Sequence, residues 1–437
     1  MGVNISTLFD TIQLYQKEGN AENALESVTI NGGTVNAVGR DSIVHNNYMY
    51  YTIPVKPPLH EGDIRAIANW LTELNYKLIQ QDTFRKRAPD TVKWILENPH
   101  VLKWLRNRGG AIWGTGMPGA GKTVLSSVVI DHLQELARLH EDIVVVFAYC
   151  RYSDAVSVRD ILAAILRQLL ERHPAVLDFV KPMYDYHKLD GTFPTEEELL
   201  SLLLEISRSN LFRLSFYVID ALDEAPRDTQ IDVLTALRSL ETNFFLTSRP
   251  LDSLKTLVPN AIFIDIAAQD GDIILLIDQK VKRTPALRRL LQNDEWRSKV
   301  VAEILEKSSG MFLLASLQLD MLRECLSIQD LREALDSLPS GVDDMYAATL
   351  ERLDKQPRAE LARRTLAWVS YAYRSLKIEE LQRAVAVHPE THEYDSERLV
   401  DGESLVSLCC GLLVVDSRSM LVRLILQKLY RTNLPAK

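Results

Sequence analysis

Eight residues in the first third of the chain have the types and spacing of a phosphate-binding loop. They are Gly116, Met117, Pro118, Gly119, Ala120, Gly121, Lys122 and Thr123, which fit the pattern G-x-x-x-x-G-K-[ST]. Glycines let backbone N–H groups surround phosphates, Lys122 reaches the β and γ oxygens, and the Thr123 hydroxyl ligates magnesium. With Val124 as the next residue, the loop is predicted to bind ATP or GTP, or the diphosphate ADP, with Mg²⁺. The alternative is a glycine-rich turn that binds nothing.

Acidic residues follow a second apolar run further along the chain. Residues 216–219 are apolar and lead directly to Asp220, as expected of a strand whose terminal carboxylate holds the water shell of magnesium. Asp223 and Glu224 come just after it, and either carboxylate can orient or deprotonate an attacking water. We favour Glu224 as the base. The alternative is a solvated acidic turn.

A third apolar run, residues 244–247, leads to Arg249. An arginine at this end of a strand can sense the γ-phosphate from the edge of the sheet. An arginine that covers a surface turn is the alternative interpretation.

The elements that must position these residues alternate along the chain. Apolar runs predict strands at residues 111–114, 143–149, 216–219, 244–247 and 261–266. Helical patterns start at Lys122 and recur near residues 157–172, 195–208 and 229–240. Strands that alternate with helices imply a parallel sheet covered on both faces, so we predict an α/β P-loop NTPase fold.

The remaining chain divides into further segments. From Asp272 to about Val387 the pattern is almost wholly helical, and residues 411–416 and 420–425 suit a small hairpin, as in a winged helix. We expect an N-terminal segment and linker at 1–60, a P-loop NTPase domain with a helical lead-in at 61–270, a helical arm at 271–355 and a winged-helix-like region at 356–437.

The N-terminal segment combines short helical patterns with a strand-like stretch at residues 28–44 that is rich in Gly and Asn. A flexible linker or hairpin is one interpretation, and an edge that pairs with copies of itself is the other. The first residues also match the pattern for N-myristoylation at Gly2, which would give only a weak anchor.

Composition narrows the functional classes. The chain of 437 residues carries a formal net charge of −9, which offers a nucleic-acid backbone no long-range attraction. Its four cysteines (Cys150, Cys325, Cys409 and Cys410) have no C-x-x-C spacing, so buried free thiols are expected. No apolar run reaches the length of a membrane span, and we expect an intracellular protein of the cytoplasm.

Three motifs together resemble the NACHT class of signal-transduction NTPases: residues 119–123, the acidic box 220–224 and the run 247–250. The resemblance is closest to fungal incompatibility-type proteins with a nephrocystin-3-like NTPase segment. Further matches are residues 69–71, 82–84 and 93–95 in the lead-in, 309–313 and 334–339 in the arm, and 366–410 in the winged-helix part.

This resemblance implies a slow NTPase that is locked by ADP and opened by ATP, so that molecules assemble with each other and engage protein effectors. Two features depart from the family. Leu426 stands where a histidine usually follows Ile425, and the chain stops at Lys437 without ankyrin or WD repeats, as expected of a truncated paralogue or of an incomplete gene model.

Three functions fit the sequence. A nucleotide-gated signalling scaffold, of the kind found in innate-immunity-like pathways, is the first. An ATPase enzyme coupled to a substrate is the second, and steady turnover above roughly one per second would favour it. A module that binds nucleotide without hydrolysis is the third.

Overall fold

The computed structural model describes residues 61–151, 156–388, 391–415 and 420–424. The predictions for residues 1–60, including the short helices, the strand-like stretch and Gly2, lie outside this part, as does the tail 425–437. The chain separates into units Met1–Glu61 and Gly62–Lys437, and the second unit contains the elements described here except for Glu61, the first residue of α2. None of its described helices is long and apolar enough to cross a membrane.

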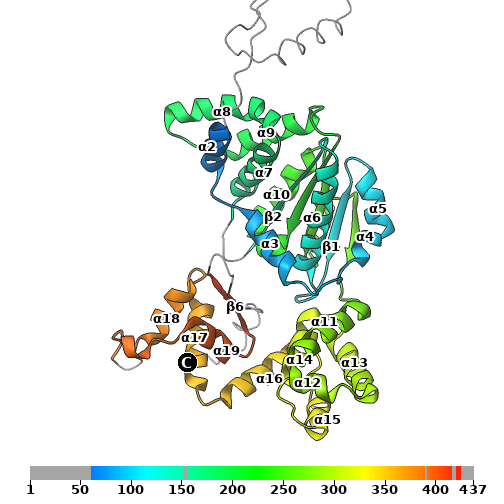
Figure 1. Ribbon diagram of the computed structural model, residues 1–437. Helices are drawn as coiled ribbons and strands as arrows, with labels where there is room; N and C mark the ends of the chain where they lie inside the picture. The colour runs from blue at the N-terminus through cyan, green and yellow to red at the C-terminus, as the bar shows by residue number, and fades with distance from the viewer. Residues whose placement is uncertain (1–60, 152–155, 389–390, 416–419, 425–437) are drawn as a thin grey trace, which may run out of the picture. The chain divides into compact units, whose positions relative to one another are not determined.

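A five-stranded parallel sheet forms the centre of the NTPase part, in the order β2-β3-β4-β1-β5. The strands are β1 (Ala111–Thr115), β2 (Ile143–Tyr149), β3 (Leu214–Asp220), β4 (Asn243–Ser248) and β5 (Ala261–Asp265). Thr115 is in register with Ser248, and Tyr149 with Asp220. All strands run the same way (Figure 1), so their carboxyl ends share one edge of the sheet. The predicted site residues end or follow these strands, since Asp220 is the last residue of β3, Gly116 follows β1 and Arg249 follows β4.

Helices and short 3₁₀ turns precede and connect these strands. They are α2 (Glu61–Leu71), α3 (Tyr76–Lys86), α4 (Trp94–Glu97), α5 (Pro99–Arg106), α6 (Lys122–Leu139), α7 (Val158–Arg172), η1 (Pro174–Val176), α8 (Leu177–Asp190), α9 (Glu196–Arg208), η2 (Leu222–Glu224), α10 (Arg227–Ser239) and η3 (Asp252–Leu257). All seven side chains of β2 are buried. Since neighbouring side chains of a strand point to opposite faces, both faces are covered there, as the continuous apolar run predicted.

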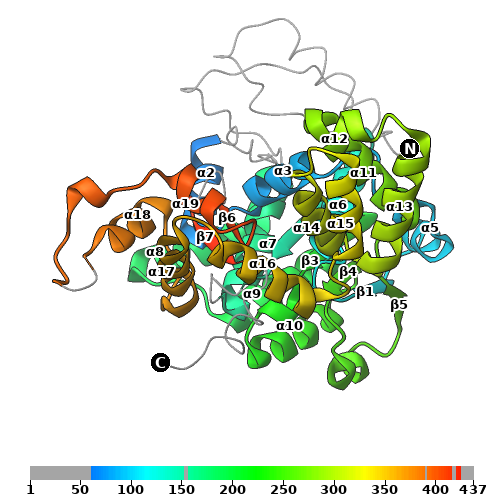
Figure 2. The same ribbon diagram turned by 90° about the horizontal axis from the view of Figure 1, so that it is seen from below.

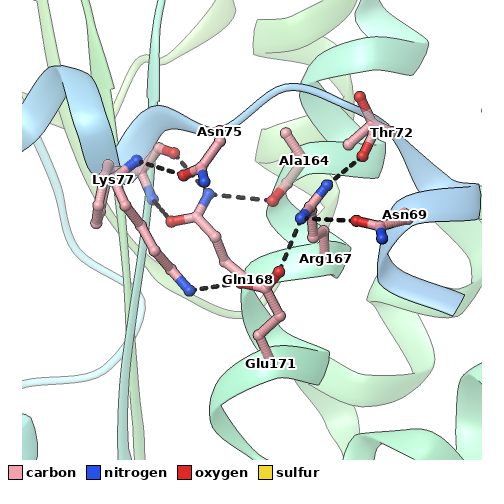
Figure 3. A network of polar contacts seen from close by, with 9 residues as sticks. Asn69, Thr72, Asn75, Lys77, Ala164, Arg167, Gln168 and Glu171 are labelled. Carbon is pink, nitrogen blue, oxygen red and sulfur yellow. Dashed lines mark hydrogen bonds and ion pairs between the residues drawn. The ribbon is translucent and has the colours of Figure 1, made fainter. Parts of the chain in front are cut away.

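The lead-in helices are fastened to α7 by a polar network (Figure 3). Arg167 donates from Nη1 to the carbonyl of Thr72, from Nη2 to Asn69 Oδ1 at 3.1 Å and from Nε to Glu171 Oε1 at 2.8 Å. Lys77 pairs with the other oxygen of Glu171. One carboxylate and one guanidinium therefore hold both α2 and α3 against the NTPase core.

The chain after β5 is helical and then ends in a small hairpin. The elements are α11 (Asp270–Arg283), α12 (Pro285–Leu290), α13 (Asp294–Ser308), α14 (Phe312–Leu322), α15 (Ile328–Asp336), α16 (Val342–Asp354), α17 (Ala359–Tyr371), α18 (Ile378–Ala386), η4 (Ser396–Arg398), α19 (Gly402–Leu408), β6 (Leu413–Val415) and β7 (Val422–Leu424). The hairpin β6-β7 is antiparallel and lies beside α19 (Figure 2). The predicted helical run and hairpin are confirmed.

Separate apolar cores support these segments. One core extends from Ile67 to Ile266, a second from Ala268 to Leu338 and a third from Tyr346 to Leu424. Three of the cysteines are buried and free, as expected, whereas Cys410 is only partly buried.

The sequence patterns missed helix α8. It contains Pro182, which breaks the backbone hydrogen-bond ladder of a helix and weakened the prediction. Leu177 and Val180 are buried, so packing on the NTPase core stabilises a helix that the local sequence disfavours.

Candidate nucleotide-binding site

The phosphate-binding loop joins β1 to α6 and has the backbone that its glycines allow. Gly119 and Gly121 have φ angles of 79° and 95°, in the left-handed region that other residues rarely adopt. A Cβ atom on Gly119 would lie 2.7 Å from Leu313 Cβ, and one on Gly121 would lie 2.9 Å from Phe312 Cδ2. These positions therefore require glycine for both conformation and space.

Lys122 begins α6, and its side chain turns back over the loop. Its Nζ donates to the carbonyl of Gly116 at 2.9 Å and to that of Met117 at 3.1 Å. Burial lowers the pKa of Lys122, while the carboxylates of Asp223 and Asp220 act in the opposite direction. The ammonium group thus lies within the loop, where phosphate oxygens would meet it.

Asp220 is at the end of β3 and is 1% exposed. Its Oδ1 accepts hydrogen bonds from Ser126 Oγ at 2.7 Å and Thr247 Oγ1 at 2.6 Å, and Thr123 also bonds to the carboxylate. Burial raises the pKa of Asp220, and the three hydroxyl groups counteract this rise. The structure brings together Thr123 and Asp220, as the motif predicted.

The residues fit magnesium bound with a nucleotide. A hydroxyl and a carboxylate are the hard oxygen ligands that Mg²⁺ takes, usually with waters and phosphate oxygens completing the shell. Among the described residues no group of three or more His, Cys, Asp or Glu side chains could hold a metal. A metal at Thr123 and Asp220 would therefore depend on the phosphates of the nucleotide.

Asp223 and Arg249 contact each other at the same edge of the sheet. Arg249 Nε lies 3.1 Å from Asp223 Oδ2, and the Arg249 backbone N–H donates to Asp223 Oδ1 at 2.9 Å. Glu224 is half-buried in η2. Its charge affects the pKa of Lys122, as do the charges of Asp223, Asp220 and Arg249. All the charged residues predicted from the three motifs thus form one electrostatic cluster.

Two sets of residues at this site were not predicted from the sequence. Ser126 lies one helical turn after Thr123, so helical spacing alone could have placed it beside Asp220. Phe312 and Leu313 lie far along the chain, yet the Leu313 N–H donates to the carbonyl of Gly119 at 3.2 Å. No local pattern connects the start of α14 with the phosphate-binding loop.

Comparisons with known proteins agree with the motifs. Residues 90–249, which contain the loop, the acidic box and Arg249, match the family model described as nephrocystin 3, N-terminal. Over 357 residues the chain is 27% identical to vegetative incompatibility protein HET-E-1 of Podospora anserina, a match that covers 76% of this chain and 25% of that protein. The chain therefore spans about a quarter of the length of this relative. Both findings confirm the resemblance indicated by the motifs.

Solved structures give a weaker likeness. The ORC1 protein of Aeropyrum pernix in complex with DNA is 15% identical with a TM-score of 0.36, covering 81% of this chain and 96% of that one. The Drosophila ORC bound to DNA is 14% identical with a TM-score of 0.36, covering 90% and 96%. These values are too low to inform function.

Proposed function

We propose that this chain, a relative of the fungal incompatibility-type NACHT proteins with a nephrocystin-3-like segment, is a nucleotide-gated switch of intracellular signalling. In this proposal ATP or GTP binds with Mg²⁺ through residues 116–124, and slow hydrolysis returns the protein to its ADP-bound form. Lys122 contacts the phosphates, Thr123 and Asp220 hold the metal, and Glu224 is the base. Arg249 senses the γ-phosphate.

The observation that carries the proposal is the direct contact between the phosphate-binding loop and helix α14. Leu313 packs on Gly119 and Phe312 packs on Gly121, and the Leu313 N–H binds the loop carbonyl. A loop that changes shape around a third phosphate would move against these two side chains. Since packed contacts are not continuously deformable, such a movement would favour a second arrangement of the arm.

A small apolar pocket extends this connection. Its lining comprises Pro118 of the loop, residues of α14 and α16 and their approaches (Met311, Leu313, Leu314, Leu317, Val342, Met345, Tyr346 and Thr349) and Leu412 just before β6. Three segments of the chain therefore meet beside the loop. We propose that the nucleotide state is transmitted through this apolar contact to surfaces that bind further copies of the chain or protein effectors.

Two other functions remain candidates on the same site. A substrate-coupled ATPase needs a second charged cleft near the γ-phosphate, and a non-hydrolysing module needs no base at Glu224. We favour the switch because the arm contacts the loop glycines themselves, which neither alternative requires.

The test measures the mass of the purified protein by light scattering with ADP and with a non-hydrolysable ATP analogue, together with turnover. The expected result is a larger mass with the analogue and turnover below roughly one per second. Phe312→Ala should shift this mass response, whereas Phe179→Ala, a substitution away from the loop, should not. An unchanged mass with rapid turnover would establish an enzyme instead, and bound nucleotide without turnover would establish a passive module.

A further inference from the structure

A polar hollow lies between α3 and α6, two helices that pack side by side (Figure 1). It has a volume of about 520 Å³, within the usual range of small-molecule sites. Its lining comprises Gln80, Gln81, Phe84, Arg85, Arg87, Pro89, Asp131, Gln134 and Arg138. We call this hollow the α3/α6 groove.

The groove is basic although the chain as a whole is acidic. Three guanidinium groups, those of Arg85, Arg87 and Arg138, line it against the single carboxylate of Asp131, in a chain of net charge −9. Among the residues that the structure describes, none of the three arginines forms an ion pair. Three like charges that converge on one hollow repel each other, and an anion between them would remove this repulsion.

Arg87 gives the most specific indication of a ligand. Its Nη1 is buried and has no hydrogen-bond partner among the described residues. Its guanidinium carbon lies over the ring of Phe84, 4.4 Å from the ring centre, a contact that stabilises the cation beside the groove. A planar guanidinium with an unused donor is suited to phosphate oxygens.

Helix ends alone do not explain this arrangement. Arg85 and Arg138 lie in the last turns of α3 and α6, where a cation favours the helix dipole. That effect accounts for each residue separately, but it requires neither their convergence nor the buried donor of Arg87. Burial also raises the pKa of Asp131, so the environment disfavours the one negative charge in the groove.

The groove is separate from the phosphate-binding loop. Asp131 is nine positions after Lys122 on α6, a separation of about 14 Å along a helix. A phosphate held by Lys122 cannot also reach the middle of the groove. The two sites therefore use opposite parts of the same helix.

We propose that the α3/α6 groove is a second ligand site, which binds a small anion carrying two or more phosphate groups. Arg87 and Arg138 hold the phosphates, Phe84 supports Arg87, and the side-chain amide of Gln134 adds a neutral donor. The carboxylate of Asp131 repels the phosphates and thereby limits the affinity of the groove for this anion.

Pyrophosphate is the probe, titrated by calorimetry into the full-length chain that carries Lys122→Ala, so that the phosphate-binding loop is disabled. Circular dichroism confirms the fold of each variant. Adding Arg87→Gln with Arg138→Gln should weaken binding about tenfold or more, since each guanidinium contributes charge-assisted hydrogen bonds. Arg106→Gln with Arg289→Gln removes two exposed arginines elsewhere and should change the dissociation constant less than about twofold.

Asp131→Asn tests the proposal in the opposite direction, by an expected gain in affinity. It removes the only negative charge of the groove with little change in shape, and it should tighten pyrophosphate binding by about threefold or more. The Asp131→Asn measurement tests the proposal even if the arginine variant does not fold. Equal affinity in the groove and control variants, weaker or unchanged affinity in Asp131→Asn, or no binding at low salt would overturn the proposal.

Discussion

Arg249 binds Asp223 through both its side chain and its backbone, with Nε 3.1 Å from Oδ2 and the N–H 2.9 Å from Oδ1. The loop after β4 is thereby fastened to the turn after β3. For Arg249 to reach a γ-phosphate as proposed, the side-chain ion pair has to open, while the backbone hydrogen bond can remain. In the proposed function Asp223 would thus compete with the nucleotide for the arginine, which is consistent with our proposal of Glu224 as the general base.

The strength of this ion pair can be measured by a double-mutant cycle. The Asp223 side chain is 7% exposed and that of Arg249 is 29% exposed, so removing the cation leaves a nearly buried charge less stabilised. Arg249→Ala should lower the free energy of unfolding by about 2 kcal/mol. Asp223→Asn combined with Arg249→Ala should cost about 1 kcal/mol less than the sum of the single changes in denaturant titrations. Strict additivity would contradict the pairing.

Loss of Lys122 should strongly weaken nucleotide binding. Two charge-assisted hydrogen bonds to phosphate oxygens contribute about 3 kcal/mol, so Lys122→Ala should weaken affinity about 100-fold. Titration with a fluorescent ATP analogue measures this change, and Lys103→Ala, an exposed lysine of α5, is the control. Wild-type affinity in Lys122→Ala would refute the site assignment.

Glu224→Gln should retain ATP but block hydrolysis. A positioned general base accelerates proton transfer by at least about 100-fold, so turnover should fall by this factor. Affinity for ATP should change by less than about threefold, because the substitution keeps the shape of the side chain. Phosphate release and equilibrium binding provide the two measurements, with Glu241→Gln as an exposed control. A larger loss in Asp223→Asn than in Glu224→Gln would exchange their roles.

Ser126 and Thr247 should act on the metal through Asp220. Each hydroxyl group donates to the same buried oxygen, and a hydrogen bond to a charged group contributes about 1.5–3 kcal/mol. Mg²⁺ is expected to raise nucleotide affinity by a certain factor in the wild type. Ser126→Ala and Thr247→Val should each make this factor about tenfold smaller. Ser126→Thr keeps the hydroxyl and should restore the wild-type dependence on Mg²⁺. Ser201→Ala on the exposed face of α9 should have no effect. An unchanged Mg²⁺ titration in both variants would show that Asp220 needs no such positioning.

The attachment of the lead-in should depend on pH through Glu171. Burial opposes its ionisation, but Lys77 and Arg167 outweigh burial and lower the pKa of Glu171 below its usual value of 4.5. The folded state therefore binds the proton more weakly than the unfolded state, and the stabilisation is present above pH 4.5 and is lost as pH falls through the lowered pKa. Glu171→Gln should cost about 1 kcal/mol at pH 7 and less at acidic pH in urea titrations. Glu205→Gln, an exposed control on α9, should show no such difference, and a cost that is independent of pH would refute the prediction.

Local patterns predicted most of the sheet. The apolar run at residues 143–149 coincides with strand β2, because a continuous apolar run of this length is typical of a buried parallel strand. The same patterns missed α8, where packing of Leu177 and Val180 outweighs the effect of Pro182.

The sequence by itself determined the types of residue at the site and the edge of the sheet on which they lie. Phosphate chemistry requires glycines, a lysine and a hydroxyl at fixed spacing, and parallel strands bring their carboxyl ends together, so the motifs and the alternation of strands with helices predict Lys122 and Asp220 as site residues. Only the tertiary structure decided that Asp223 pairs with Arg249, that Leu313 packs on Gly119 and that arginines of α3 and α6 share a groove. Such contacts depend on the rotation and packing of elements distant in sequence, and no periodicity within one element specifies them.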